Sequence, residues 1–128
     1  MIDSKIKIGV IGLGYVGLPL AVEFSKQFDV VGFDISQERI DDLAKNHDET
    51  LMISKTQLSE FNGKFSSKEK ELAKCNVYIV TVPTPIDRGN KPNFTPLIKA
   101  SQTIAKFITK NDIVVYESTV YPGATEEI

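Results

Sequence analysis

The fold of this 128-residue chain is decided by the stretch Lys5-Ile6-Lys7-Ile8-Gly9-Val10-Ile11-Gly12-Leu13-Gly14-Tyr15-Val16-Gly17-Leu18-Pro19-Leu20-Ala21. It begins with alternating charged and apolar residues and becomes wholly apolar and β-branched at Val10-Ile11. Gly12, Gly14 and Gly17 follow at G-x-G-x-x-G spacing, and an apolar pattern of helical period comes after them. This order predicts a strand, a tight turn and a helix.

Each of the three glycines has a separate physical role in a turn that binds a dinucleotide. Gly12 permits the tight turn, Gly14 lets the backbone approach a pyrophosphate, and Gly17 lets the helix pack closely on the strand. An anion at this place is favoured by the free N–H groups and by the dipole of the helix that follows. The spacing therefore predicts a phosphate-binding turn.

A second strand that ends in an acidic residue supports this interpretation. The segment Val30-Val31-Gly32-Phe33-Asp34 is apolar up to Asp34, which lies about twenty positions after Gly14. A carboxylate there suits the two ribose hydroxyls of NAD and repels the 2′-phosphate of NADP. We therefore predict that NAD is the cofactor and that Asp34 binds its ribose. The alternative is that Asp34 is an ordinary solvated strand end.

Length and composition predict one globular domain over residues 1–128. Hydrophobic residues make up 41% of the chain and charged residues 25%, and the net charge is −2. This charge gives no electrostatic footprint for nucleic acid or for an anionic membrane surface. The uncharged segment 8–22 is interrupted by glycines and a proline, so it resembles neither a signal peptide nor a membrane span. With Cys75 as the single cysteine, we expect a cytoplasmic protein.

The rest of the chain alternates between strand and helix patterns, and residues 46–67 are the hardest part to interpret. Strands that alternate with helices predict an α/β fold of the Rossmann type. This fold is a doubly wound parallel sheet of order 3-2-1-4-5 between two layers of helices. The predicted strands are residues 5–11, 30–34, 64–66, 76–82 and 113–116. The predicted helices are residues 15–27, a helix that follows an N-cap at Ser36, residues 67–74, and a helix that starts at Thr95-Pro96.

Ligands of such folds bind beyond the carboxyl ends of the strands. Four polar or glycine-rich segments occupy those places in the sequence: residues 12–17, Asp34, residues 81–85 and residues 117–119. We expect them to line one crevice. Cys75 precedes a buried strand and has no basic partner nearby in the sequence, which favours a structural thiol over a nucleophile. His47 lacks partners for a metal or a catalytic triad, so no metal site is predicted.

Three stretches together resemble the UDP-glucose/GDP-mannose dehydrogenase family. They are Gly9-Val10-Ile11-Gly12-Leu13-Gly14-Tyr15-Val16-Gly17-Leu18-Pro19, Thr81-Val82-Pro83-Thr84-Pro85 and Glu117-Ser118-Thr119-Val120-Tyr121-Pro122-Gly123-Ala124-Thr125. The last two look most like the bacterial branch that oxidises UDP-N-acetylhexosamines for surface polysaccharides. The resemblance implies two successive NAD-dependent oxidations of a sugar C6 alcohol. It covers only the N-terminal part of that architecture.

The resemblance also implies roles for individual residues. Tyr15 and Val16 would lie along the pyrophosphate, and Arg39 would line the adenosine side. In the other half, Thr84 and Thr119 would face the nicotinamide, and Thr119 would also hold water or the reacting oxygen. The remaining cofactor contacts implied are Pro83 and Ser118. Arg39 could instead be an ordinary exposed arginine, and Thr84, Ser118 and Thr119 could serve only in turns.

The nucleophilic cysteine and the lysine of this family belong to a later region, so we expect the 128-residue chain alone to be inactive. The same region would bind the UDP-sugar substrate and form a homodimer. No partner of nucleic acid or membrane type is expected. The alternative is a stand-alone module that binds or senses NAD without catalysis. A 3-hydroxyacid type of dehydrogenase would not explain residues 81–85 and 117–123 together.

Overall fold

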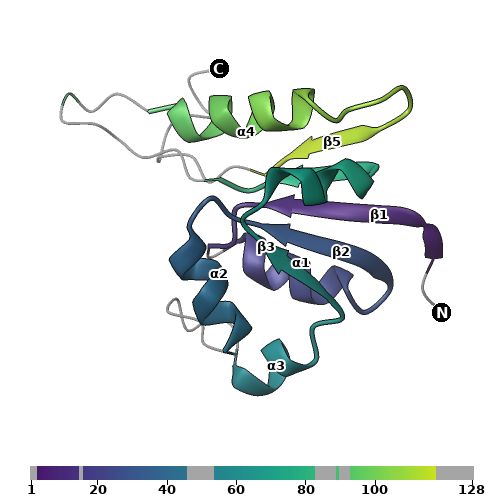
Figure 1. Cartoon of the computed structure of the whole chain (residues 1–128), viewed down its shortest axis with the longest axis vertical. Coiled ribbons are helices and arrows are strands. Elements are labelled where there is room, and N and C mark those ends of the chain that lie inside the picture. The colour runs from purple at the N-terminus through teal and green to yellow at the C-terminus, as the bar shows by residue number, and fades with distance from the viewer. Residues whose placement is uncertain (1–2, 15, 46–53, 83–88, 90–92, 118–128) are drawn as a thin grey trace.

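The computed structural model describes residues 3–14, 16–45, 54–82, 89 and 93–117 (Figure 1). At its centre lies a parallel sheet of five strands in the order β3-β2-β1-β4-β5. This arrangement confirms the predicted order 3-2-1-4-5. The strands are β1 (Asp3–Ile11), β2 (Phe28–Phe33), β3 (Gly63–Ser66), β4 (Val77–Val80) and β5 (Ile113–Tyr116).

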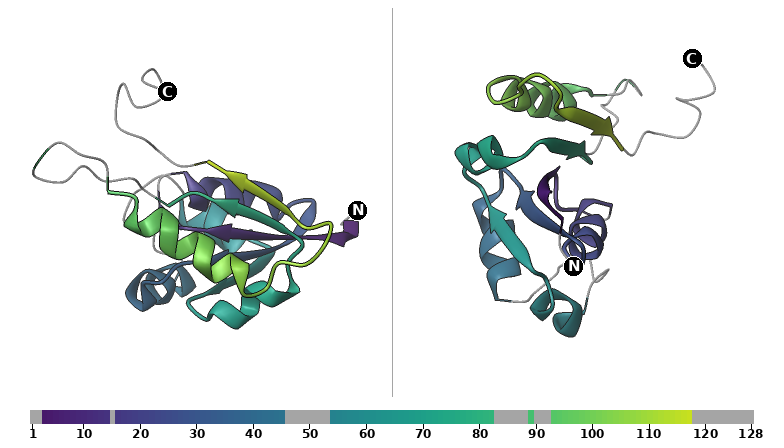
Figure 2. Two further views of the ribbon diagram at one scale, coloured as in Figure 1. Left: turned by 90° about the horizontal axis from the view of Figure 1, so that it is seen from above. Right: turned by 90° about the vertical axis from the view of Figure 1, so that its right-hand side faces the viewer.

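Helices cover both faces of this sheet, and Figure 2 shows α1 and α4 on opposite sides of the strands. This confirms the predicted three-layer α/β/α architecture of the Rossmann type. None of the helices in the described part of the chain combines the length and the hydropathy that a membrane span needs. The helices are α1 (Gly17–Phe24), α2 (Gln37–Ala44), α3 (Lys55–Ser59), the 3₁₀ helix η1 (Glu69–Lys74) and α4 (Thr95–Ala105).

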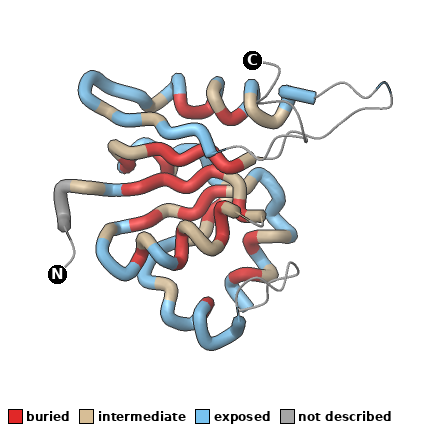
Figure 3. The backbone as a smooth tube through the Cα atoms, turned by 180° about the vertical axis from the view of Figure 1, so that it is seen from behind, coloured by how far each residue is buried: buried red, intermediate tan, exposed pale blue. Residues whose placement is uncertain are grey.

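The core is divided by the sheet into two apolar clusters, because successive strand residues point to opposite faces. Ile79 of β4 belongs to one cluster, and its neighbours Tyr78 and Val80 belong to the other. The buried positions concentrate on the central strands (Figure 3). Helices α1, α2 and α3 contribute Leu18, Ala21, Val22, Ile40, Leu43 and Leu58 to the first cluster, and η1 and α4 contribute Leu72, Ala100 and Ile104 to the second.

The structure differs from the sequence predictions at several helix ends. The first helix is shorter than the predicted 15–27, because the chain after Phe24 continues as turns in which Lys26 N–H donates to Glu23 and Gln27 N–H to Phe24. The helix predicted from Thr95-Pro96, with Thr95 as its expected cap, has Phe94 as its N-cap residue instead. Thr95 already lies within α4, and its N–H donates to the side chain of Asn93 at 3.0 Å.

Helix α3 is absent from the sequence predictions. Its N-terminus carries a capping box: Ser54 accepts from the N–H of Gln57, and the Gln57 side chain accepts from the N–H of Ser54. The S-x-x-Q spacing is the signal that could have located this helix. Its single buried residue, Leu58, explains why no apolar period was visible.

Candidate functional site

The turn between β1 and α1 has the geometry that a phosphate-binding turn requires. Gly12 has φ +97°, which a residue with a side chain adopts only under strain, and its N–H donates to the carbonyl of Phe33 at 2.8 Å. A Cβ atom on Gly17 would lie 1.7 Å from the carbonyl oxygen of Gly12. By contrast, a Cβ atom on Gly14 would meet no atom of the described residues within 4 Å. The first and third glycines are therefore required by the protein itself, and the second faces open space.

The start of α1 lies beside this open space. The helix begins at Gly17, and its N-cap residue Val16 makes no side-chain hydrogen bond to the first turn. The first turn also contains no acidic residue. The N–H groups and the positive end of the helix dipole at this terminus therefore favour a bound anion. A pyrophosphate fits both the donors and the space over Gly14.

Asp34 lies directly after β2 and contacts the glycine turn. Its Oδ2 accepts from the backbone N–H of Leu13 at 3.0 Å, and its Oδ1 accepts from the N–H of Ser36 at 3.0 Å. Its own N–H donates to the carbonyl of Ser66 at 3.1 Å, which ties this position to the end of β3. The first two bonds hold the carboxylate beside the glycine turn at the carboxyl edge of the sheet, and the third holds the backbone that carries it. That is the position a ribose-binding acid needs.

Arg39 reaches the same turn from α2. Its Nε donates to the carbonyl of Leu13 at 2.8 Å, across 26 residues of sequence. The helix that carries it is capped by Ser36, whose hydroxyl accepts from the Arg39 N–H at 3.2 Å. The peptide groups of Leu13 are thus held from two sides, by Asp34 at the nitrogen and by Arg39 at the oxygen. The alternative of an ordinary exposed arginine does not account for this long-range contact.

Thr81 belongs to the segment 81–85 that is predicted to line the crevice, but no individual role for it follows from the sequence. In the structure its hydroxyl donates to the carbonyl of Gly12 at 2.6 Å. No local pattern could have indicated this contact, because it depends on the pairing of β4 with β1. Only the polar residue type at the carboxyl end of an apolar strand was available as a signal.

The structure therefore brings one group of predicted residues together at the carboxyl edge of the sheet. The arrowheads of the strands mark this edge in Figure 1. The end of β5 reaches the same edge, because the N–H of Glu117 donates to the carbonyl of Val80 at 2.7 Å. The group consists of Gly12, Gly14, Val16, Gly17, Asp34 and Arg39, and the predicted residues Tyr15, Pro83, Thr84, Ser118 and Thr119 lie outside the described residues.

Cys75 lies away from this edge, between η1 and β4, and is buried. Burial raises the pKa of its thiol to about 12, so the thiolate is strongly disfavoured. The prediction of a structural thiol is confirmed. The Tyr78 hydroxyl lies 3.0 Å from the carbonyl oxygens of both Leu72 and Cys75.

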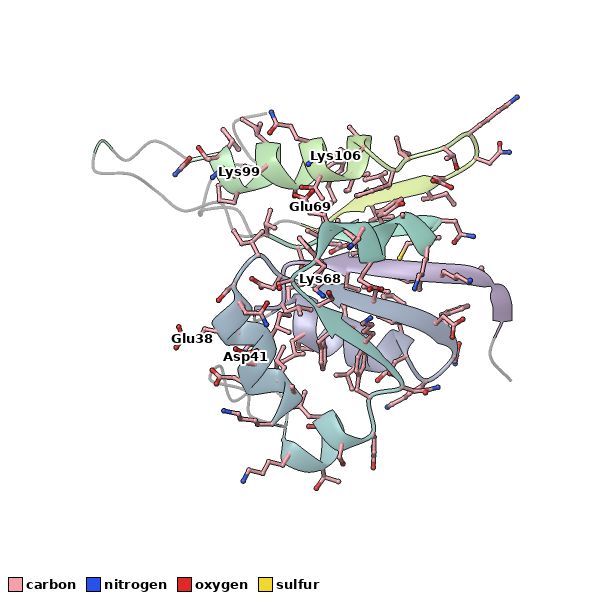
Figure 4. All side chains as sticks on the ribbon, in the orientation of Figure 1. Glu38, Asp41, Lys68, Glu69, Lys99 and Lys106 are labelled. Carbon is pink, nitrogen blue, oxygen red and sulfur yellow. The ribbon has the colours of Figure 1, made fainter. Side chains whose placement is uncertain are left out.

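Some charged side chains away from the site form ion pairs that are at least partly open to solvent. Glu69 of η1 and Lys106 at the end of α4 meet with an Nζ–Oε2 distance of 2.8 Å (Figure 4). Lys64 and Glu71 form a second pair at 2.9 Å, and this contact lowers the pKa of Glu71. Such pairs contribute little to stability in water. Within the described ranges, no three His, Cys, Asp or Glu side chains gather as a metal site would require.

Comparisons with known proteins agree with this geometry. The sequence profile of the UDP-glucose/GDP-mannose dehydrogenase family, NAD binding domain, matches residues 6–128. The chain is 58% identical to UDP-N-acetyl-D-glucosamine 6-dehydrogenase of Pseudomonas aeruginosa over 97% of its own length and 30% of that protein. It is 52% identical to Protein CapL of Staphylococcus aureus over 94% of its own length and 28% of that protein.

A solved structure gives the same result in three dimensions. The UDP-D-ManNAc dehydrogenase from Pyrococcus horikoshii superposes with a TM-score of 0.84 at 33% identity, over 95% of this chain and 30% of that chain. The chain thus spans about 30% of the length of these relatives. The predicted cofactor, NAD, is confirmed by the matching family. The chain belongs to the UDP-glucose/GDP-mannose dehydrogenase family and corresponds to its NAD-binding domain.

Proposed function

We propose that the chain is the N-terminal, cofactor-binding domain of a longer NAD-dependent nucleotide-sugar 6-dehydrogenase. The enzyme oxidises the C6 alcohol of a UDP-N-acetylhexosamine to the uronate for surface polysaccharide biosynthesis. The single observation that carries the proposal is the glycine turn with open space over Gly14 and the Asp34 carboxylate beside it. The 58% identity to a protein named UDP-N-acetyl-D-glucosamine 6-dehydrogenase supports the substrate class.

The chain's residues divide into three binding roles. Gly12 and Gly17 shape the turn, and the pyrophosphate lies over Gly14, held by backbone N–H groups at the start of α1. Asp34 accepts hydrogen bonds from the adenosine ribose, and Arg39 lines the adenosine side. NAD, when bound, supplies a hydride acceptor. The family resemblance assigns the remaining cofactor contacts to Tyr15, Val16, Pro83, Thr84, Ser118 and Thr119.

Other parts of the enzyme belong to the same proposal. The relatives are about three times as long as this chain, which covers 30% of the first of them. We assign the nucleophile, the base and the UDP-sugar pocket to the additional region. The proposal also includes that the complete enzyme is a homodimer and that it is located in the cytoplasm. The glycine turn and Asp34 can bind and orient NAD, but they supply no group that attacks an oxidised sugar.

The experiment compares the 128-residue chain with the complete polypeptide of its gene. Both are incubated with NAD and either UDP-N-acetylglucosamine or UDP-N-acetylgalactosamine, and NADH is followed by absorbance. We expect NADH only from the complete polypeptide. Failure of the complete polypeptide with both of these sugars and with UDP-N-acetylmannosamine would refute the substrate class. Turnover by the 128-residue chain would refute the assignment of catalytic groups to the additional region. A reading frame that ends at Ile128 would favour the module without catalysis.

A further inference from the structure

Thr81 makes a contact with the glycine turn that no binding role so far explains. It follows β4 directly and is 6% exposed. Its hydroxyl oxygen lies 2.6 Å from the carbonyl oxygen of Gly12 and 3.1 Å from that of Ile11. The Ile11 carbonyl already accepts from the Thr81 backbone N–H at 2.8 Å. The shorter side-chain contact therefore assigns the hydroxyl proton to Gly12.

The Gly12 carbonyl oxygen lies against two groups. One is Gly17, where an added Cβ atom would lie 1.7 Å from the Gly12 oxygen and 2.3 Å from the Thr81 hydroxyl. The other is the Thr81 hydroxyl itself. Gly12 holds the φ of +97° that this orientation requires. The carbonyl oxygen thus stays out of the open space over Gly14, where none of the residues that the structure describes comes within 4 Å of an added Cβ atom.

This orientation matters for an anionic ligand. A carbonyl oxygen carries partial negative charge, and a phosphate placed beside it would be repelled. If the Gly12 peptide rotated, its oxygen could turn toward the space that the pyrophosphate needs. Holding the peptide in one orientation before binding removes an ordering cost that the ligand would otherwise have to overcome.

We propose that Thr81 is a positioning residue for cofactor binding, whose hydroxyl fixes the Gly12 carbonyl so that the turn presents a pyrophosphate site. The inference rests on the proposed NAD-binding role of the glycine turn. Thr81 acts through Gly12 and touches no reacting atom. Its effect is therefore on affinity for ligands that contain the pyrophosphate.

Substitution of Thr81 by valine or by serine separates the effect of the hydroxyl group from the effect of the side-chain shape. In Thr81→Val a methyl group replaces the donor at 2.6 Å from the Gly12 oxygen. That is closer than the roughly 3.5 Å at which such atoms attract, so the carbonyl must move. Thr81→Ser keeps the donor and removes only the methyl group. Thr81→Ala removes the donor without placing a new group against the carbonyl.

The test measures Kd values of the 128-residue chain and these variants for NAD, ADP-ribose and adenosine, with apo Tm recorded for each. NAD and ADP-ribose contain the pyrophosphate, and adenosine, followed by NMR titration, does not. We expect Thr81→Val to raise Kd for NAD and ADP-ribose by about tenfold or more. We expect Thr81→Ser to stay within about threefold, and adenosine Kd to change by less than about twofold in every variant.

Several outcomes decide the matter. An unchanged affinity of Thr81→Val for ADP-ribose would overturn the positioning role. A loss of adenosine affinity equal to the loss for ADP-ribose would also overturn it, because it would show a general structural defect. If Thr81→Val does not fold, Thr81→Ala is judged by the same two criteria. Wild-type chain that binds neither NAD nor ADP-ribose would instead refute the proposed function, so the two failures are distinguishable.

Discussion

The backbone N–H of Leu13 donates to Oδ2 of Asp34 at 3.0 Å, although the two residues are 21 positions apart. The glycine turn and the acid that follows β2 are therefore one hydrogen-bonded unit before any ligand arrives. Arg39 adds a bond from its Nε to the Leu13 carbonyl at 2.8 Å. A change at Asp34 should consequently affect both the turn and the ribose site.

Asp34→Ala removes the acceptor for the N–H groups of Leu13 and Ser36 and the proposed ribose contact. We expect NAD binding to weaken by about 1–3 kcal/mol and the apo Tm to fall. Asp34→Asn removes the charge and keeps one of the two acceptor oxygens, so it loses one of the bonds from the N–H groups of Leu13 and Ser36. It should raise the affinity for NADP relative to NAD, since the repulsion of the 2′-phosphate is lost. An unchanged NADP-to-NAD ratio in Asp34→Asn, measured by calorimetry, would refute the ribose role.

Gly14 and Gly17 offer a matched pair of alanine substitutions. Gly14→Ala places its methyl group in open space, so the free energy of unfolding should change by less than about 1 kcal/mol. The same methyl group should weaken NAD binding by about tenfold or more, because it occupies the proposed pyrophosphate position. Chemical denaturation and NAD titration of this variant measure the two effects.

Gly17→Ala should behave in the opposite way. Its methyl group would lie 1.7 Å from the Gly12 carbonyl oxygen, so the turn itself must distort. We expect the free energy of unfolding to fall by about 1–3 kcal/mol or more. A Gly17→Ala protein as stable as wild type, or a Gly14→Ala protein with full NAD affinity, would contradict the geometry of the turn.

The buried thiol of Cys75 should make the folded chain lose stability at alkaline pH. Burial raises the pKa of its thiol from 9.0 to about 12 in the folded chain, so the unfolded chain releases its proton first. The contribution of the buried thiol to the free energy of unfolding is fully present below about pH 9. It is lost as the pH rises toward about 12, by at most about 1.4 kcal/mol per pH unit. Denaturation of wild type and Cys75→Ala across this range measures the difference in slope. Identical slopes would contradict the burial effect on the thiol.

Thr119 is expected to support chemistry more than cofactor affinity. The hydroxyl can donate and accept, so it can order water or the substrate oxygen during hydride transfer. In the complete enzyme, Thr119→Val should lower kcat by roughly tenfold to a thousandfold, or about 1.4–4 kcal/mol. The KM for NAD should change much less, because interactions made in the transition state appear in turnover. An unchanged kcat with a strongly raised NAD KM would reduce Thr119 to a cofactor contact.

The strands of the sheet could be predicted from the sequence, because apolar strand patterns and glycine spacing are local signals. The apolar segment before Gly12 and the acid at Asp34 predicted the two strands and the turn between β1 and α1. The structure adds that Asp34 holds the turn through Leu13, a bond that depends on the register of β1 and β2. The roles of the side chains toward a ligand stay predictions.

Two kinds of feature could not be predicted from the sequence: contacts between strands that are distant in the chain, and short helices. The hydroxyl of Thr81 reaches Gly12 only because β4 lies beside β1, and nothing local distinguishes it from other threonines. Helix α3 buries only Leu58, so it lacks the repeated apolar positions that reveal longer helices. The predicted order puts residues 113–116 at the edge of the sheet, but the apolar sequence of β5 gives no sign that Ile113 and Tyr116 are exposed.

The most direct test of the central claim is a calorimetric titration of the 128-residue chain with NAD and, separately, with NADP. Open space over Gly14 and the carboxylate of Asp34 predict binding of NAD at a single site and binding of NADP weaker by about tenfold or more. NADP bound as tightly as NAD, or more tightly, would contradict the account.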